Sequence, residues 1–217
     1  MKWRVEMQQT IRTFSAPLIR RLPEYHSYLE SVQVQGLSTI SSTAIAQHLN
    51  IDPIVVRKDL EAVGAVGRPK IGFVVADLIQ AIHTYMGWGN LDELVIAGCG
   101  SLGSALIGYS GFEKRGFRIV AGFDRDPDKN GREINGVMVF PIKKMVNLVK
   151  RLHVEIGIIA VPAEAAQEVA DMMVEAGVKG LWNFSPCALK VPRSVVVQQE
   201  DLIASLVILQ KGMKHEK

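Results

Sequence analysis

The sequence contains little cysteine and no long apolar run. Cys99 and Cys187 are the two cysteines among 217 residues, which is too few for a disulfide framework and is typical of a reducing compartment. No apolar stretch reaches the roughly 18 residues that a membrane helix needs. Residues 1–9 carry charges but lack the apolar core of a secretory signal. We therefore expect a cytoplasmic protein that has no membrane partner.

A strong net charge of either sign is also missing. The chain has 25 Lys and Arg against 22 Asp and Glu, a formal charge of +3. This small excess is compatible with nucleic-acid binding without requiring it, because a local patch matters more than the total. A composition of 48% hydrophobic and 22% charged residues excludes disordered and collagen-like chains. What remains is a folded protein of one or two domains.

Two regions of different character meet near Gly87 and Gly89, which interrupt helical periodicity. The pattern before them is helical, with short loops. After them, apolar runs typical of strands alternate with helical stretches, which indicates a parallel sheet with crossover helices. We expect a winged helix-turn-helix domain over residues 1–86, a doubly wound Rossmann-like α/β domain over 87–200 and a C-terminal helix over 201–217.

The apolar periodicity predicts individual elements in both regions. Leu18, Leu22, Tyr25 and Leu29 lie on one face of a helix that begins near residue 16 and ends near Gly36. The other expected helices cover residues 43–49, 53–63, from 77, from 103, 143–151, 163–175 and from 201. The expected strands cover residues 70–75, 93–98, 117–123, 137–140, 156–161, 180–184 and 194–198. The last six strands with their helices are typical of a dinucleotide-binding domain.

A glycine-rich turn carries the strongest chemical signal. Residues 98–103 read G-C-G-S-L-G, between a predicted strand and a predicted helix. In such a turn Gly98 permits the tight bend, Gly100 lets the backbone approach a pyrophosphate, and Gly103 lets the helix pack closely on the strand. The helix N-terminus, with Ser101 and Leu102, would present free N–H groups to the phosphates. A turn without any ligand is the alternative interpretation.

An acidic residue follows at the spacing of a nucleotide site. Asp124 stands 21 residues after Gly103, at the end of the second predicted strand. A carboxylate there would accept a hydrogen bond from the ribose 2′-hydroxyl and would repel a 2′-phosphate, which favours NAD over NADP. Arg125 beside it would accommodate the phosphate and leaves NADP open. For Cys99, inside the turn, a packing role is favoured over a reactive thiol.

No constellation for catalysis is evident. His83 and His153 lack a recognisable partner carboxylate or nucleophile, and no metal-ligand spacing appears. A dehydrogenase would normally add a substrate domain of some size, whereas one helix follows the predicted nucleotide domain. We expect neither a catalytic nor a metal site.

The N-terminal region has the pattern of a helix-turn-helix. Asp52 and Pro53 favour the start of its second helix, as cap and first helical residue. That helix would enter the major groove of double-stranded DNA while a following wing touches the backbone. The candidate DNA contacts are Arg57, Lys58, Arg68 and Lys70. Residues 1–88 hold nine Lys and Arg against seven Asp and Glu, so a helical dimerisation module is the alternative.

With these motifs the chain resembles the bacterial redox-sensing transcriptional repressor family Rex. The matching stretches are residues 21–23, 40–42, 56–60, 109–117, 123–127, 160–166 and 180–186. The resemblance implies a homodimer that binds operator DNA when NADH is scarce and releases it when NADH accumulates. It also implies that the helix from about Asp201 is exchanged between subunits.

The resemblance assigns the nicotinamide side of the cofactor as well. It implies that Val161, Pro162, Asn183 and Phe184 border the ring and that an apolar pocket lies near Phe184 and Tyr109. Such a pocket should prefer the neutral ring of NADH to the charged ring of NAD⁺.

The chain departs from the family pattern at several positions. Val63 and Val66 stand where the family usually has aromatic residues, Val55 where it has glutamine, and Pro69 where it has a basic residue. Ser27 replaces an arginine that can pair with the acid at Asp201. A diverged DNA-binding protein with a weakened redox response is therefore one alternative. A small NAD-dependent oxidoreductase with an N-terminal oligomerisation module is the other.

Overall fold

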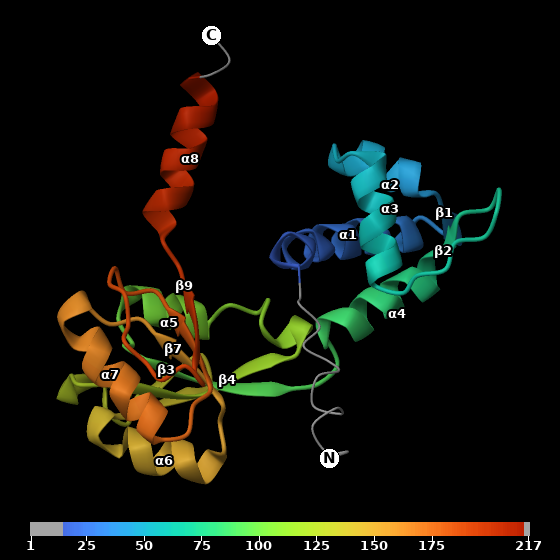
Figure 1. Cartoon of the computed structure of the whole chain (residues 1–217). Coiled ribbons are helices and arrows are strands. Elements are labelled where there is room, and N and C mark those ends of the chain that lie inside the picture. Colours follow the sequence, from blue (N-terminus) through green and yellow to red (C-terminus); the bar gives the residue numbers. More distant parts are fainter. Residues whose placement is uncertain (1–14, 215–217) are drawn as a thin grey trace, which may run out of the picture. The chain divides into compact units, whose positions relative to one another are not determined.

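A computed structural model describes residues 15–214 of the chain (Figure 1). The segment Met1–Gln9, interpreted above as lacking a secretory signal, lies outside these residues. The chain divides into two compact units between Gly89 and Asn90. The first unit has one hydrophobic core, and the sheet of the second has a separate core on each face.

The described part of the N-terminal unit consists of four helices and a small two-stranded sheet. The helices are α1 (Ala16–Val34), α2 (Ser42–Leu49), α3 (Pro53–Ala62) and α4 (Val75–Met86). Leu18, Leu22, Tyr25 and Leu29 of α1 are all buried, which confirms the predicted apolar face. They pack with Ile45 and other apolar residues of α2, α3 and α4.

Local capping fixes the corner between α2 and α3. The Ser41 hydroxyl accepts a hydrogen bond from the Ala44 N–H at 3.0 Å and begins α2. Asn50, in the left-handed region with φ +52°, ends it. Asp52 Oδ1 accepts from the Ile54 N–H at 2.6 Å, and Pro53 is the first residue of α3. The predicted helix-turn-helix is therefore formed.

The strand predicted over residues 70–75 is wrong in its extent. Only β2 (Phe73–Val74) is a strand, and it pairs antiparallel with β1 (Thr39–Ile40), which the sequence did not indicate. Lys70 sits in a turn with φ +62°. The turn is closed by the Arg68 N–H, which donates to the Gly72 carbonyl at 2.7 Å. An apolar run as short as this does not reveal that its first half is a turn.

The second unit contains a seven-stranded sheet with the order β5-β6-β4-β3-β7-β8-β9. Its strands are β3 (Asp92–Ala97), β4 (Phe117–Asp124), β5 (Glu133–Ile134), β6 (Val137–Pro141), β7 (Ile156–Ile159), β8 (Gly180–Asn183) and β9 (Val196–Gln199). Every pairing is parallel except that of β5 with β6. The chain runs outward from β3 in both directions, which is the doubly wound Rossmann topology predicted from the sequence.

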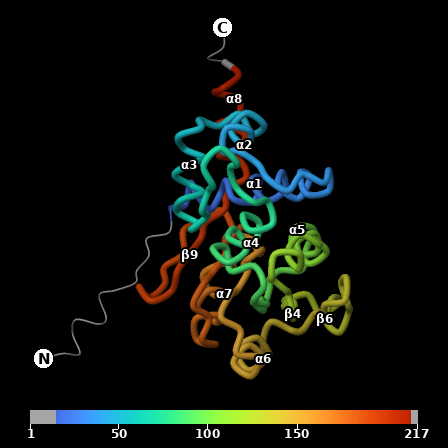
Figure 2. The backbone as a smooth tube through the Cα atoms, turned by 90° about the vertical axis from the view of Figure 1, so that its right-hand side faces the viewer, coloured from blue at the N-terminus to red at the C-terminus, as the bar shows by residue number. Residues whose placement is uncertain are grey.

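Helices α5 (Ser101–Ile107), α6 (Met145–Leu152) and α7 (Ala163–Glu175) cover the two faces of the sheet, as Figures 1 and 2 show. The last helix, α8 (Leu202–Lys214), extends away from the sheet in Figure 1. The unit also has 3-10 turns at Glu113–Arg115, Pro127–Lys129 and Ile142–Lys144. Val95 of β3 belongs to the core that includes α6 and α7, and Ile96 to the core that includes α5. Adjacent residues of β3 thus pack into the cores on opposite faces of the sheet, because strand side chains alternate between faces.

Two predicted boundaries at the carboxyl edge of the sheet are corrected by the structure. The helix after the glycine-rich turn begins at Ser101 rather than Gly103, because the Gly100 carbonyl already accepts from the Ser104 N–H at 2.8 Å. The strand predicted over 156–161 ends at Ile159. Residues 160–162 instead form a loop at the edge of the sheet before α7 begins.

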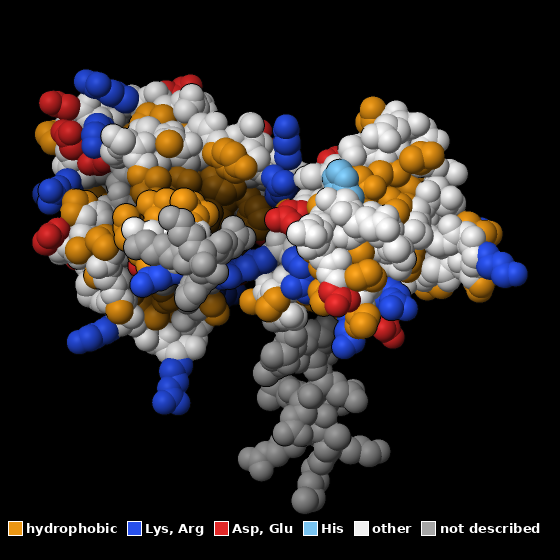
Figure 3. All heavy atoms as spheres, turned by 90° about the horizontal axis from the view of Figure 1, so that it is seen from above, with side chains coloured by type: hydrophobic (Ala, Val, Ile, Leu, Met, Phe, Trp, Pro, Cys, Tyr) orange, Lys and Arg blue, Asp and Glu red, His pale blue; other side chains and the backbone are white. Residues whose placement is uncertain are grey.

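The C-terminal helix α8 begins at Leu202, close to the predicted Asp201. All its residues from 202 to 213 are exposed, although most are apolar. Apolar side chains accordingly gather over α8 in Figure 3. Within residues 15–214, no helix has both the length and the apolar character needed to cross a membrane.

Candidate functional site

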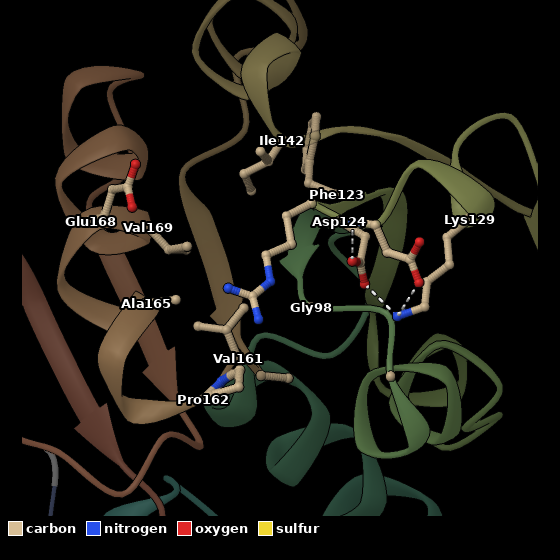
Figure 4. Close-up of a pocket in the computed structure, with 14 residues that line it drawn as sticks. Gly98, Phe123, Asp124, Lys129, Ile142, Val161, Pro162, Ala165, Glu168 and Val169 are labelled. Carbon is tan, nitrogen blue, oxygen red and sulfur yellow. Dashed lines mark hydrogen bonds and ion pairs between the residues drawn. The ribbon is translucent and has the colours of Figure 1, made fainter.

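A cavity of about 470 Å³ lies at the carboxyl ends of β3, β4 and β7 (Figure 4). The strand order reverses direction between β3 and β7, and ligands of doubly wound sheets bind at such a point. The lining residues are Gly98, Gly100, Phe123, Asp124, Arg125, Asp126, Lys129, Ile142, Ala160, Val161, Pro162, Ala165, Glu168 and Val169.

The glycines of the turn differ in what surrounds them. Gly98 has φ +91°, and a Cβ there would overlap the Ala160 carbonyl. A Cβ on Gly103 would overlap the Gly98 carbonyl, so α5 packs directly on the turn. A Cβ on Gly100 would meet no atom within 4 Å. Gly98 and Gly103 thus build the turn, whereas Gly100 borders open space in the cavity.

Asp124 is the most constrained polar group of the cavity. Its Oδ2 accepts hydrogen bonds from the Cys99 N–H at 2.8 Å and from Lys129 Nζ at 3.0 Å, and its Oδ1 accepts from the Asp126 N–H at 2.9 Å. Burial opposes ionisation, but these bonds and the lysine charge outweigh it and lower the pKa of Asp124 below its ordinary value. A carboxylate accepts about four hydrogen bonds, so one position on Oδ1 is left for a ligand hydroxyl.

Lys129 was missed by the sequence reasoning. Its ammonium group pairs with Asp124 and lies 3.9 Å from Asp126 Oδ2, and Figure 4 shows the contact from the 3-10 turn to the strand end. The signal available was the turn at Asp126 and Pro127, shortly after Asp124. This turn folds the chain back so that Lys129, five positions after Asp124, reaches the carboxylate.

Cys99 is buried behind the turn. Its thiol donates to the Phe123 carbonyl at a distance of 3.7 Å. Burial, with the nearby Asp124 charge, raises the pKa of Cys99 to about 11. The thiolate is therefore disfavoured, and these contacts are those of a packing residue.

The structure places the candidate cofactor residues in three groups. Gly98, Gly100, Asp124, Arg125, Val161 and Pro162 line the cavity. Ser101, Leu102 and Gly103 form the first turn of α5, and Tyr109, Asn183 and Phe184 lie outside the cavity lining.

Tyr109 and Phe184 are joined by a row of aromatic rings. The ring centroids are 5.3 Å apart from Tyr109 to Phe112, 5.9 Å from Phe112 to Trp182 and 4.6 Å from Trp182 to Phe184. Asn183 is fully buried and donates to Gln199 Oε1 at 2.7 Å and to the Cys187 carbonyl at 2.9 Å. Its amide thus holds the loop after β8 to β9.

In the N-terminal unit the candidate DNA contacts are all exposed. Arg57 and Lys58 lie on α3, and Arg68 and Lys70 lie on the loop between α3 and β2. The Arg57 Nε donates to the Pro53 carbonyl at 3.4 Å. The cations therefore lie on the second helix of the helix-turn-helix and on the loop that follows it.

A partly buried ion pair, also missed by the sequence reasoning, ties α3 to α1. Arg21 donates to both carboxylate oxygens of Asp59, at 2.7 and 2.8 Å, and the Tyr25 hydroxyl donates to Asp59 Oδ2 at 2.7 Å. The hydrogen bond to Asp59 raises the pKa of Arg21, and burial, together with Asp59, raises the pKa of Tyr25. Asp59 directly follows Lys58, so this contact fixes the helix that carries the cations.

Two histidines meet in the same unit. His26 Nε2 and His83 Nε2 are 2.7 Å apart, and His26 Nδ1 is 3.4 Å from Glu30 Oε2. Among the residues that the structure describes, no group of three or more His, Cys, Asp or Glu is arranged to hold a metal ion.

Two family models match the chain. The model described as a CoA binding domain matches residues 91–187, most of the sheet unit. The model described as a putative DNA-binding protein N-terminus matches residues 14–61, which include α1, α2 and most of α3. The division between the models agrees with the division between the two units.

Curated relatives match along nearly the whole chain. The redox-sensing transcriptional repressor Rex of Treponema denticola is 42% identical over 203 residues, which are 94% of this chain and 97% of the relative. The repressor of the same name from Carboxydothermus hydrogenoformans is 43% identical over 91% of this chain and 95% of its own.

Solved structures share the fold. A crystal structure of RSP in complex with β-NAD⁺ and operator DNA has a TM-score of 0.87 and 34% identity, over 96% of this chain and 95% of that one. RSP in complex with β-NADH gives a TM-score of 0.82 and 33% identity, over 96% and 97% of the two chains.

Proposed function

The chain belongs to the Rex family of redox-sensing transcriptional repressors, and from this premise we propose that it binds operator DNA and releases it when NADH binds. The observation that carries the proposal is the cavity at the reversal of the sheet, with the glycine-rich turn and Asp124 on one wall. The same chain carries a helix-turn-helix with exposed cations on its second helix. Its relatives along the whole length are named repressors.

The adenosine half of the cofactor fits the turn and Asp124. Gly100 leaves room for the pyrophosphate because a Cβ-sized space above it is empty. The remaining acceptor position on Asp124 Oδ1 suits a ribose hydroxyl. Lys129 already neutralises part of the carboxylate charge, and Arg125 lines the cavity, but a 2′-phosphate would still have to approach an ionised Asp124. We therefore propose NADH and NAD⁺ as the ligands.

The nicotinamide half is assigned to the apolar side of the unit. Val161 and Pro162 line the cavity, and the aromatic row from Tyr109 to Phe184 offers further apolar surface. NAD⁺ carries a positive charge on its nicotinamide, and NADH does not. Because an apolar surface disfavours an unpaired charge, we expect NADH to bind more tightly.

Two such chains would act together on DNA. Helix α8 exposes Leu202, Leu206, Leu209 and Met213, which lie at helical spacing on one stripe. An apolar helix of this kind normally packs against another surface, and we propose that it completes a homodimer in the cytoplasm. NADH binding that favours one state of the dimer then changes DNA affinity by thermodynamic linkage.

Ser27 supports a second version of this function. Its hydroxyl donates to the Pro23 carbonyl at 2.9 Å within α1, so it supplies no cation for Asp201. Arg21, nearly two turns earlier in α1, pairs with Asp59. A repressor that binds DNA and NADH with weak coupling between them is thus the second candidate, whereas the relatives give no support to an oxidoreductase.

Operator binding measured against both nucleotides tests the proposal. Duplexes selected from a random library by the full-length protein would be titrated with NADH and with NAD⁺ at two salt concentrations. Loss of binding with NADH but not NAD⁺ supports the redox sensor. A steep salt dependence without a nucleotide effect supports the second candidate, and no DNA binding at low salt contradicts both.

Paired variants separate the two activities. Asp124→Ala should weaken NADH binding in titration calorimetry and leave the fold and DNA binding intact. Lys58→Ala should weaken DNA binding uniformly across sequences, reduce the salt slope by about 1 and spare NADH binding. Arg151→Ala removes an exposed cation of α6 and serves as the control, with neither affinity changed.

A further inference from the structure

Helix α3 presents a single exposed stripe. Its members follow the spacing i, i+3, i+4 and i+7 and share one face: Ile54, Arg57, Lys58 and Glu61. The opposite face is buried through Val56, Asp59 and Leu60. The stripe thus begins with an apolar residue, continues with two cations and ends with an acid.

Ile54 is held at the beginning of this stripe. Its N–H donates to Asp52 Oδ1 at 2.6 Å, and it follows Pro53, the first residue of α3. The ion pair between Arg21 and Asp59 fixes the helix one turn later. Ile54 is nevertheless 54% exposed. An exposed apolar residue alone is unremarkable in proteins, but this one shares its face with the cations assigned to DNA.

The chemistry of the major groove restricts what such a side chain recognises. In a helix-turn-helix, the N-terminal residues of the second helix reach the base edges. Isoleucine neither donates nor accepts a hydrogen bond, so it would leave the polar edges of guanine, cytosine or adenine without partners after removing their water. The apolar group on a base edge in this groove is the C5-methyl group of thymine.

We propose that Ile54 is a specificity-determining residue that selects thymine by contact with its C5-methyl group. This inference rests on the proposed function, in which α3 enters the major groove of the operator. Arg57 and Lys58, one turn further along the same face, hold the helix to phosphates or guanine edges, so that Ile54 approaches the base step next to them.

Replacement of single thymines by deoxyuridine tests the contact directly. Deoxyuridine lacks the methyl group and keeps the Watson–Crick pairing of thymine. In a duplex selected by the full-length protein, each thymine would be replaced in turn and binding measured by anisotropy. At one position in each half-site the replacement should weaken binding about fourfold, the effect of one buried methyl-sized group. In Ile54→Ala the same replacement should have no effect.

Two further variants test whether the deoxyuridine effect depends on the Ile54 side chain. Leu152→Ala truncates an exposed apolar side chain at the end of α6, and this variant should keep the full deoxyuridine effect. Ile54→Val retains a branched side chain and should keep most of it. The inference is overturned if no replacement weakens the wild type, or if the penalty persists in Ile54→Ala. Failure to select any duplex would instead contradict the proposed function itself.

Discussion

Asp124 illustrates how much of a site can depend on one side chain. Two backbone N–H groups and the Lys129 ammonium converge on its carboxylate, and these contacts join the glycine-rich turn, the end of β4 and the turn after it. The carboxylate therefore organises the cavity before any ligand binds.

The lowered pKa of Asp124 predicts a pH-dependent contribution to stability. Because the folded-state pKa lies below that of the unfolded chain, the stabilisation is complete above about pH 4. It is lost as the pH falls from there through the folded-state pKa. In urea unfolding, the stability difference between wild type and Asp124→Asn should shrink as the pH falls below about 4. The exposed Asp128→Asn is the control, and a difference unaltered by pH would contradict the prediction.

Cys99 should resist alkylation in the folded protein. With a pKa of about 11, about one thiol in a thousand is ionised at pH 8, and the thiolate is the reactive form. We expect iodoacetamide to leave Cys99 unmodified in Cys187→Ser, as measured by mass spectrometry, until urea unfolds the chain. Rapid labelling of the native variant would show that the turn opens.

At the scale of elements, the strand, turn and helix from β3 to α5 form one unit in which two glycines have separate tasks. Gly103→Ala would place a methyl group on the Gly98 carbonyl and should lower stability by about 1–3 kcal/mol. Gly100→Ala meets no neighbour and should keep its stability while losing NADH affinity, because the methyl group occupies the space assigned to the pyrophosphate. Thermal unfolding and calorimetry measure the two effects. Equal destabilisation by both variants would refute this division.

The ion pair between α1 and α3 should control the position of the DNA-facing helix. Arg21→Met leaves the buried Asp59 with Tyr25 as its remaining side-chain partner and should lower stability by about 1.5–3 kcal/mol, the range for hydrogen bonds to charged groups. Arg21→Met combined with Asp59→Leu should recover much of this loss. The exposed Arg20→Met is the control. Chemical unfolding followed by circular dichroism measures all three, and a stable single variant would contradict the assignment.

At the scale of the whole molecule, helix α8 stands out because its apolar side chains are exposed in the single chain. Leu206→Glu combined with Leu209→Glu should shift the protein from dimer to monomer in analytical ultracentrifugation, because it places charges on the stripe. Operator affinity should fall with it, since two half-sites are then bound independently. Lys211→Glu on the same helix is the charge control. A dimer that survives the double substitution would place the interface elsewhere.

The elements with strong local signals were predictable. The apolar spacing of α1, the cap Asp52 with Pro53, and the glycine-rich turn between strand and helix all specify local structure through contacts near in sequence. The two-residue strand β1 and the Lys70 turn were not predictable, because a two-residue pairing depends on a partner more than 30 positions away. The Arg21–Asp59 pair was missed for the same reason, because its two residues are 38 positions apart. Lys129 lies five positions from Asp124, but its contact depends on how the turn at Asp126 and Pro127 folds back, which periodicity does not reveal.

By itself, the sequence determined the fold class and the kind of chemistry at the turn, because periodicity, caps and glycine positions act over a few residues. Its scarcity of cysteine and its small net charge excluded disulfide-rich, disordered and strongly charged proteins, but did not choose among the remaining classes. Tertiary structure alone decided which side chains share a site. The fold after β4 brought Lys129 to Asp124, and the packing of α1 against α3 paired Arg21 with Asp59. Helical spacing places Ile54, Arg57 and Lys58 on one face, but only the packing of the opposite face of α3 decided that this face is the exposed one.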